Sequence, residues 1–150
     1  MIPVVHVLLA TYNGAAFLPQ QWDSLDAQEG VALVVHVADD GSTDGTPELL
    51  RQLASRPGKA IREVRRIEAP PRRSATRSFL LLVREAVASC PDAQWFAYCD
   101  QDDVWLPGKL AAAHAVLAQH AAERPALYGG RTLAVDEQDR EGGLCPPFVE

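Results

Sequence analysis

Several kinds of segment are absent from this 150-residue sequence, and each absence narrows the classes of protein that it can encode. No run approaches the roughly 20 consecutive apolar residues of a membrane-spanning helix, so any membrane association is expected to be peripheral. The apolar start is short, lacks a basic leader and soon reaches Tyr12 and Asn13, which favours a buried strand over a signal peptide. The patterns GxGxxG, GxSxG and GxxxxGK followed by Ser or Thr are missing, which argues against a dinucleotide cofactor, a nucleophile elbow and a P-loop.

Cysteine is also scarce, and acidic residues outnumber basic ones. The three cysteines, Cys90, Cys99 and Cys145, form no CxxC pair and are odd in number. A secreted disulfide framework is therefore disfavoured, and we expect a cytoplasmic protein, peripheral at the inner face of the membrane where it meets one. The 14 basic and 20 acidic residues give a formal charge of -6, which argues against a nucleic-acid partner because phosphate backbones need a basic face.

Strand and helix patterns alternate along the rest of the chain, whose length suits one domain. Buried or partly buried strands are predicted over residues 3–10, 32–38, 61–67 and 95–99, with a fifth within 126–135. Helices are predicted over residues 16–28, 47–53, 76–89 and 107–121. This alternation predicts an α/β fold with a mostly parallel sheet between helices, formed by residues 1–135 and followed by a loose tail over 136–150.

Polar segments follow the first, second and fourth predicted strands. They are Thr11-Tyr12-Asn13, Asp39-Asp40-Gly41-Ser42 and Asp100-Gln101-Asp102-Asp103. Ligands of such sheets bind beyond the carboxyl ends of the strands, so these segments are expected to form one composite site.

The acidic segment is the candidate metal site. Its three carboxylates lie within four residues, and like charges this close are unfavourable unless a cation neutralises them. Asp100 and Asp102 point the same way if the strand geometry continues. Carboxylate oxygens suit Mn²⁺ or Mg²⁺. Spacing alone leaves open a solvated acidic turn that caps the next helix, and the position at a strand end favours the metal.

The other two segments are candidates for contacting a nucleotide. Asp40 is placed to accept a hydrogen bond from a base or a ribose hydroxyl, although these residue types equally favour a tight turn. Tyr12 is a candidate for stacking on a base, with Thr11 and Asn13 supplying hydrogen bonds. A plain turn is the stronger interpretation of that segment alone.

Three arginines and two histidines complete the candidates. Arg72, Arg73 and Arg77 surround the predicted start of the third helix, where arginine can meet phosphate, and a solvated basic surface is the alternative for at least one of them. Arg77 is the one that we assign to the composite site. His6 and His36 lie in predicted core strands and are expected to be satisfied core histidines.

Four stretches together resemble a known family. Read in order, they are LLATYNGAAFLPQQWDSL, VADDGSTDGTPELL, RSATRSFLLLVREA and FAYCDQDDVWLPGKL. They resemble the inverting family 2 glycosyltransferases, most closely the rhamnosyltransferase-like members, and the resemblance extends to about Val135. It implies a GT-A fold, which is a Rossmann-like three-layer sandwich, and inverting transfer of a sugar from a UDP- or dTDP-linked donor. It also implies a divalent metal, a glycan or lipid-linked acceptor and a role in cell-envelope polysaccharide biosynthesis.

The resemblance also assigns roles to particular residues. Thr11, Tyr12 and Asn13 match the first nucleotide-contacting loop of the family, and Asp40 matches its nucleoside-binding acid. Asp100-Gln101-Asp102 resembles the DxD element, with Asp102 the best candidate for direct metal contact.

The sequence departs from the family pattern in two respects. Ser74 and Ser78 stand where glycine and asparagine are common. The family's catalytic base belongs to a second, acceptor-binding half and is expected beyond Glu150, so a non-catalytic sugar-nucleotide-binding module or a remnant is the alternative function. A metal-dependent nucleotidyltransferase is disfavoured, because TYNGAAF is not a glycine-rich basic loop.

Overall fold

The structure, a computed structural model, describes residues 2–56, 58–120, 125–136, 138 and 140–146. The chain divides into two compact units, Met1–His114 and Ala115–Glu150, and each is described by itself.

The first unit contains a four-stranded, fully parallel sheet with the order β3-β2-β1-β4. Its strands are β1 (Val4–Thr11), β2 (Ala32–Asp39), β3 (Ile61–Arg66) and β4 (Phe96–Asp100). The two central strands, β1 and β2, are apolar almost throughout and buried on both faces, as expected for parallel strands covered by helices. The predicted parallel sheet is therefore confirmed.

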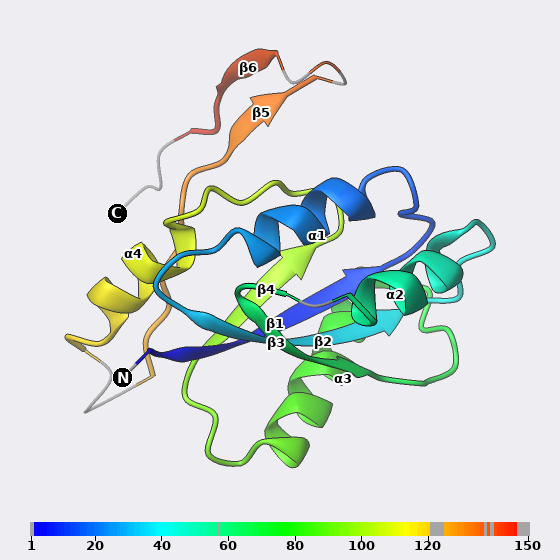
Figure 1. Cartoon of the computed structure of the whole chain (residues 1–150), viewed down its shortest axis with the longest axis horizontal. Coiled ribbons are helices and arrows are strands. Elements are labelled where there is room, and N and C mark those ends of the chain that lie inside the picture. Colours follow the sequence, from blue (N-terminus) through cyan, green and yellow to red (C-terminus); the bar gives the residue numbers. More distant parts are fainter. Residues whose placement is uncertain (1, 57, 121–124, 137, 139, 147–150) are drawn as a thin grey trace. The chain divides into compact units, whose positions relative to one another are not determined.

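Helices cover both faces of this sheet, which makes the predicted three layers (Figure 1). One face packs against α1 (Leu18–Asp26), α2 (Thr46–Ala54) and the start of α4 (Lys109–Leu117). The other face packs against α3 (Ala75–Ser89), where Leu8 of β1 meets buried residues of that helix. Alternate residues of each central strand thus enter different cores, which explains their continuous apolar sequence.

The starts of the helices follow from local sequence. Proline occupies the first turn of both α1 and α2, where its missing N–H group loses no hydrogen bond. The N-cap of α2 is Gly45, and the Asp44 side chain accepts from the backbone N–H of Thr46 at 2.9 Å. Ser74 caps α3 by accepting from the backbone N–H of Arg77 at 3.5 Å.

The second unit contains a short antiparallel pair of strands, β5 (Leu133–Val135) and β6 (Glu141–Leu144). The predicted fifth strand therefore exists only at its end, and it pairs with β6 instead of extending the main sheet. Residues 141–144 form a strand where a loose tail was expected, because backbone pairing with β5 orders a glycine-rich sequence that has no apolar alternation. Residues 147–150 of that tail lie outside the described residues, and the domain boundary after Val135 stays a prediction.

No helix among the described residues combines the length and the apolarity that crossing a membrane requires.

Candidate functional site

The carboxyl ends of β1, β2 and β4 lie at one edge of the sheet. Thr11 is the register partner of Asp39, and Ala10 is the partner of Asp100. A cavity of about 900 Å³ opens at this edge, a size in the upper range of small-molecule sites. The predicted convergence of the three polar segments is therefore confirmed.

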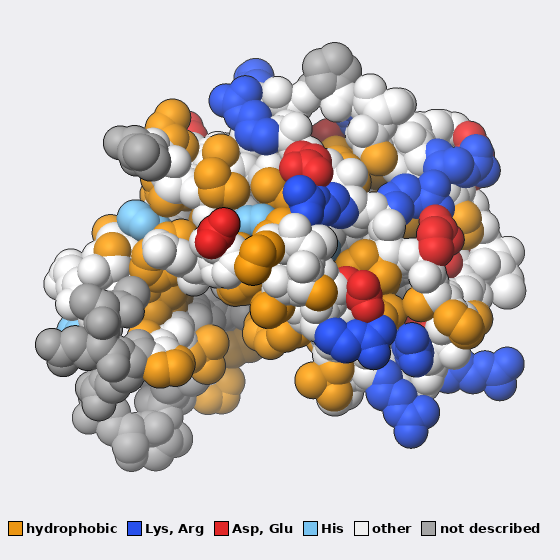
Figure 2. Space-filling view, turned by 90° about the horizontal axis from the view of Figure 1, so that it is seen from below, with side chains coloured by type: hydrophobic (Ala, Val, Ile, Leu, Met, Phe, Trp, Pro, Cys, Tyr) orange, Lys and Arg blue, Asp and Glu red, His pale blue; other side chains and the backbone are white. Residues whose placement is uncertain are grey.

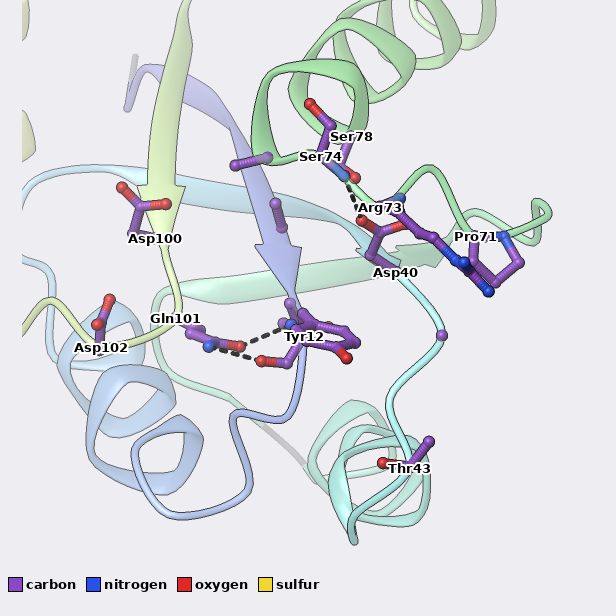
Figure 3. A pocket seen from close by; sticks show the side chains of 14 residues that line it. Tyr12, Asp40, Thr43, Pro71, Arg73, Ser74, Ser78, Asp100, Gln101 and Asp102 are labelled. Carbon is purple, nitrogen blue, oxygen red and sulfur yellow. Dashed lines mark hydrogen bonds between the residues drawn. The ribbon is translucent and has the colours of Figure 1, made fainter.

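The residues that line this cavity come from both predicted and unpredicted positions (Figure 3). Those that the sequence had marked as site residues are Thr11, Tyr12, Asp40, Asp100, Gln101 and Asp102. The sequence had also named Gly41, Arg73, Ser74 and Ser78, and the lining residues without a predicted role are Ala10, Thr43, Pro71 and Ala75.

Gln101 fixes the loop after β1 against the loop after β4. Its side-chain oxygen accepts from the backbone N–H of Tyr12 at 2.8 Å, and its amide nitrogen donates to the carbonyl of Tyr12 at 3.0 Å (Figure 3). Gly14 leaves room for this bridge, because a Cβ atom there would lie 2.1 Å from Oε1 of Gln101. The Tyr12 side chain remains 56% exposed beside the cavity. Gln101 is thus a positioning residue for Tyr12.

Asn13 joins the same loop to the one after β2. Its backbone has a positive φ of 48°, and its side-chain oxygen accepts from the backbone N–H of Thr43 at 2.8 Å. Its own N–H donates to the hydroxyl of Ser42 at 2.8 Å. Asn13 does not line the cavity, so its predicted contact with a nucleotide stays a prediction, and the contacts seen here organise the two loops.

Asp40 orders the loop that precedes α3. Its carboxylate accepts backbone N–H groups from Arg72, from Arg73 at 3.0 Å and from Ser74 at 3.0 Å. Figure 3 shows the contact with Ser74. Desolvation raises the pKa of Asp40, but these backbone hydrogen bonds outweigh it, and the net effect is a lowered pKa. A carboxylate offers about four acceptor positions, so little capacity remains for a nucleoside. Asp40 therefore holds the cavity wall as well as lining it.

Of the three arginines near α3, Arg73 lines the cavity and Arg77 does not. Arg73 has a positive φ of 53°, which is uncommon for a residue with a side chain, and the hydrogen bond to Asp40 holds its backbone there. The main-chain N–H of Arg77 contacts Ser74, and Arg77 itself is exposed. The place of these arginines before a helix does not reveal which of them the turn held by Asp40 brings to the cavity.

The carboxylates of the acidic segment, Asp100, Asp102 and Asp103, lie close enough to repel one another. Desolvation and then the charges of Asp103 and Asp102 raise the pKa of Asp100. Lys109 interacts with Asp103: burial lowers the pKa of Lys109, and the charge of Asp103 opposes that shift. The amine of Lys109 also lies 4.0 Å from the ring centroid of Trp105. Asp100 and Asp102 line the cavity, and neither forms an ion pair with a basic side chain among the described residues.

The donor atoms of this segment suit a hard divalent cation, because they are carboxylate oxygens. The carboxylates of Asp100, Asp102 and Asp103 do not lie within 4.8 Å of one another as a group of three. One or two of them with diphosphate oxygens and water is the arrangement that Mg²⁺ commonly takes. The acidic segment therefore fits a metal that is shared with a ligand.

The family model for Glycosyl transferase family 2 matches residues 6–142 of this chain. The chain belongs to glycosyl transferase family 2. This family 2 domain is 31% identical over 138 residues to the succinoglycan biosynthesis protein ExoO of Rhizobium meliloti, covering 92% of this chain and 34% of that protein. It is 27% identical over 106 residues to a glycosyltransferase of Nostoc sp., covering 71% of this chain and 30% of that one. The chain thus spans about a third of the length of these relatives.

Solved structures share the fold of this family 2 domain. The TarS protein of S. aureus, residues 1–349 in complex with UDP, superposes with a TM-score of 0.62 at 18% identity, covering 91% of this chain and 43% of that one. The mannosyltransferase PcManGT of Pyrobaculum calidifontis, in complex with GDP-Man and Mn²⁺, gives a TM-score of 0.60 at 27% identity, covering 75% of this chain and 31% of that one. The predicted family and GT-A fold are confirmed, while the rhamnosyltransferase-like and inverting character stay predictions.

Proposed function

We propose that this domain binds a UDP- or dTDP-linked sugar in the cavity and transfers the sugar, with inversion, to a hydroxyl of a glycan or lipid-linked acceptor. The observation that carries the proposal is that Asp40, Asp100 and Asp102 meet Tyr12 and Arg73 around one cavity. Membership of family 2 supports a sugar-transfer reaction. The complex of PcManGT with GDP-Man and Mn²⁺ supports a nucleotide-sugar donor, and the naming of ExoO for succinoglycan biosynthesis supports a polysaccharide product.

Each side of the cavity suits one part of such a donor. The exposed ring of Tyr12 offers a stacking surface for the base. Arg73 offers a guanidinium group for the diphosphate, and we propose it in place of Arg77 for this role. Ser74 and Ser78 then face the remaining part of the cavity, where they would contact the sugar. The departures from the family pattern at these two serines bear on which sugar is chosen.

Asp100 and Asp102 would hold the metal, Mn²⁺ or Mg²⁺. When bound there, such an ion neutralises the charge of the diphosphate leaving group. Burial and then the charges of Asp103 and Asp102 raise the pKa of Asp100, and a bound cation would offset both effects. A general base must also deprotonate the acceptor hydroxyl, and none of the cavity residues is assigned to that step. We also propose a cytoplasmic location, peripheral at the inner face of the membrane, which suits a lipid-linked acceptor.

Calorimetry with UDP, dTDP and GDP, each with Mn²⁺ and with a chelator, tests the proposal. We expect UDP or dTDP to bind more tightly with Mn²⁺, and Asp102→Asn to reduce that gain by about ten-fold or more, which is the effect of losing one good ionic contact. Binding that is indifferent to Mn²⁺ in the unaltered protein would remove the metal role of Asp102.

Asp103→Asn is the matched control, because this neighbour has the same charge and interacts with Lys109 instead of lining the cavity. It should keep most of the metal effect. Equal losses in the two variants would mean that net charge, and not the position of Asp102, governs binding. Stronger binding of GDP than of UDP or dTDP would contradict the proposal that the donor nucleotide is UDP or dTDP.

A further inference from the structure

Two buried histidines and a cysteine lie together on the α3 side of the sheet. His6 lies in β1, His36 lies in β2 and Cys90 directly follows α3. His6 is 7% exposed and His36 is 1% exposed, and Nδ1 of His6 lies 2.9 Å from Nε2 of His36. The prediction that these are satisfied core histidines is confirmed. None of the three residues lines the cavity described above.

The three side chains bring their donor atoms into one small volume. One imidazole nitrogen of each histidine and the sulfur of Cys90 all lie within 4.8 Å of one another. In a tetrahedral zinc centre, bond lengths of about 2.0 to 2.3 Å place neighbouring ligand atoms roughly 3.3 to 3.6 Å apart. The two nitrogens would therefore have to separate by only a few tenths of an ångström to share an ion.

The protonation states also suit metal binding. Burial, together with the charges of His6 and Arg65, lowers the pKa of His36 to about 4. Burial likewise lowers the pKa of His6. Both rings are therefore neutral near pH 7, and a neutral imidazole offers a lone pair on one nitrogen. The proton between the two rings would move to the outer nitrogen of the ring that carries it, and the Cys90 thiol would release its proton to solvent.

Arg65 and Glu63 of β3 are the charged groups beside this cluster. Nη1 of Arg65 donates to the sulfur of Cys90 at 2.7 Å. Nε of Arg65 also lies 2.7 Å from Oε1 of Glu63, so the carboxylate offsets the positive charge near the cluster. Basic side chains lie beside acidic ones in this way at several places on the face in Figure 2. Cys90 is half-buried, and solvent reaches the cluster from its side.

We propose that His6, His36 and Cys90 form a zinc site in which water takes the fourth position. Two imidazole nitrogens and a thiolate suit Zn²⁺, whereas the oxygen ligands of Asp100 and Asp102 suit Mg²⁺ or Mn²⁺. The site would tie β1, β2 and the end of α3 together on the face opposite α1 and α2. Its role is independent of the proposed donor site.

Co²⁺ and Zn²⁺ are the probes for this site, added separately to full-length protein that has been freed of metal with a chelator. We expect the thiolate charge-transfer absorption and the intense visible bands of a tetrahedral centre to reach their end point at one Co²⁺ per chain. Zn²⁺ should abolish both features and raise the midpoint of thermal unfolding, and excess Mg²⁺ should do neither. A Co²⁺ spectrum without a thiolate band, or without a one-to-one end point, would overturn the proposal.

Cys90→Ala is the decisive variant, because this position lies at a helix end and tolerates a small side chain. It should lose the thiolate band and weaken Zn²⁺ binding by about 100-fold or more. Removing only a group that hydrogen-bonds to a metal ligand already weakens metal binding by up to about 100-fold, and Cys90 is itself a proposed ligand. Cys145→Ala removes an exposed cysteine of the other unit and should change neither quantity. Equal effects of the two variants, or unchanged affinity in Cys90→Ala with retained helical circular dichroism, would show adventitious thiol binding and contradict the site. Asp102→Asn should leave the cobalt spectrum unchanged.

Discussion

Asp26 and Asp40 make nearly the same set of hydrogen bonds at opposite ends of the sheet. Asp26, the last residue of α1, accepts the backbone N–H groups of Lys59, Ala60 and Ile61, each at 3.0 Å, just where β3 begins. Asp40 follows β2 and accepts those of three consecutive residues before α3. In both cases backbone hydrogen bonds outweigh desolvation and lower the pKa of the carboxyl group.

The two carboxylates differ in what lies beside them. Asp40 lines the cavity together with Asp100 and Asp102, whereas Asp26 is not among the residues of that cavity. A carboxylate that gathers three N–H groups is therefore a way to order a loop, and it does not by itself mark a ligand site. Position at the carboxyl ends of parallel strands distinguishes Asp40, because that is where this class of sheet binds ligands.

The largest effect is expected for Asp40→Asn. The amide nitrogen cannot accept a hydrogen bond, so at least one backbone N–H group of the loop before α3 loses its partner. We expect the free energy of unfolding to fall by roughly 2 kcal/mol and UDP affinity to fall by about ten-fold or more. Urea unfolding and calorimetry measure the two quantities. Unchanged UDP affinity would reduce Asp40 to the same structural role as Asp26.

Asp26→Asn should separate stability from binding. We expect it to lower the free energy of unfolding by roughly 2 kcal/mol as well, and to leave UDP affinity unchanged. Asp23→Asn is its control, because Asp23 has the same charge on the same helix and, among the described residues, its side chain forms only an exposed pair with Arg56 at 3.4 Å. That control should change stability by about 0.5 kcal/mol or less. A loss of UDP affinity in Asp26→Asn equal to that in Asp40→Asn would break the comparison.

Acid should weaken both loops in the same direction. The folded-state pKa of each carboxyl group lies below the ordinary aspartate value of 3.8, so the unfolded chain takes up protons first as the pH falls. The stability that these groups contribute is fully present well above that value and is lost as the pH falls through the folded-state pKa. Urea unfolding between about pH 5 and pH 3 should show a declining stability, with a shallower decline in Asp26→Asn. An equally steep decline in that variant would contradict the role assigned to Asp26.

The smallest effect on the free energy of unfolding is expected for Gly14→Ala, next to the Gln101 bridge. Gly14→Ala should displace the Gln101 amide, release Tyr12 and lower the free energy of unfolding by about 1 kcal/mol. Gly108→Ala places a methyl group in open space and is the matched control. In a Gln101→Ala background, Gly14→Ala should have little further effect, because the group that it meets is gone. Fully additive losses would show that the Gln101 bridge is not what Gly14 protects.

Much of the fold could be predicted because its signals are local. Continuous apolar runs marked β1 and β2, and proline in the first turn marked α1 and α2. The pairing of β5 with β6 could not be predicted, since β6 is glycine-rich and a short antiparallel pair depends on backbone contacts. The same limit explains the arginines, because the turn that directs Arg73 to the cavity is held by the Asp40 carboxylate, 33 positions earlier in the chain.

The order of motifs along the chain determined the family, the parallel sheet and the strand ends at which the acidic residues would gather. These properties depend on residue type and spacing, which the sequence states directly. Only the tertiary structure decided that Gln101 and Asn13 bind loop backbone and that Arg73 rather than Arg77 lines the cavity. It also decided that His6, His36 and Cys90 bring their donor atoms within 4.8 Å of one another. Those outcomes depend on distances between residues remote in sequence, and such distances are fixed only when the sheet and its helices have packed.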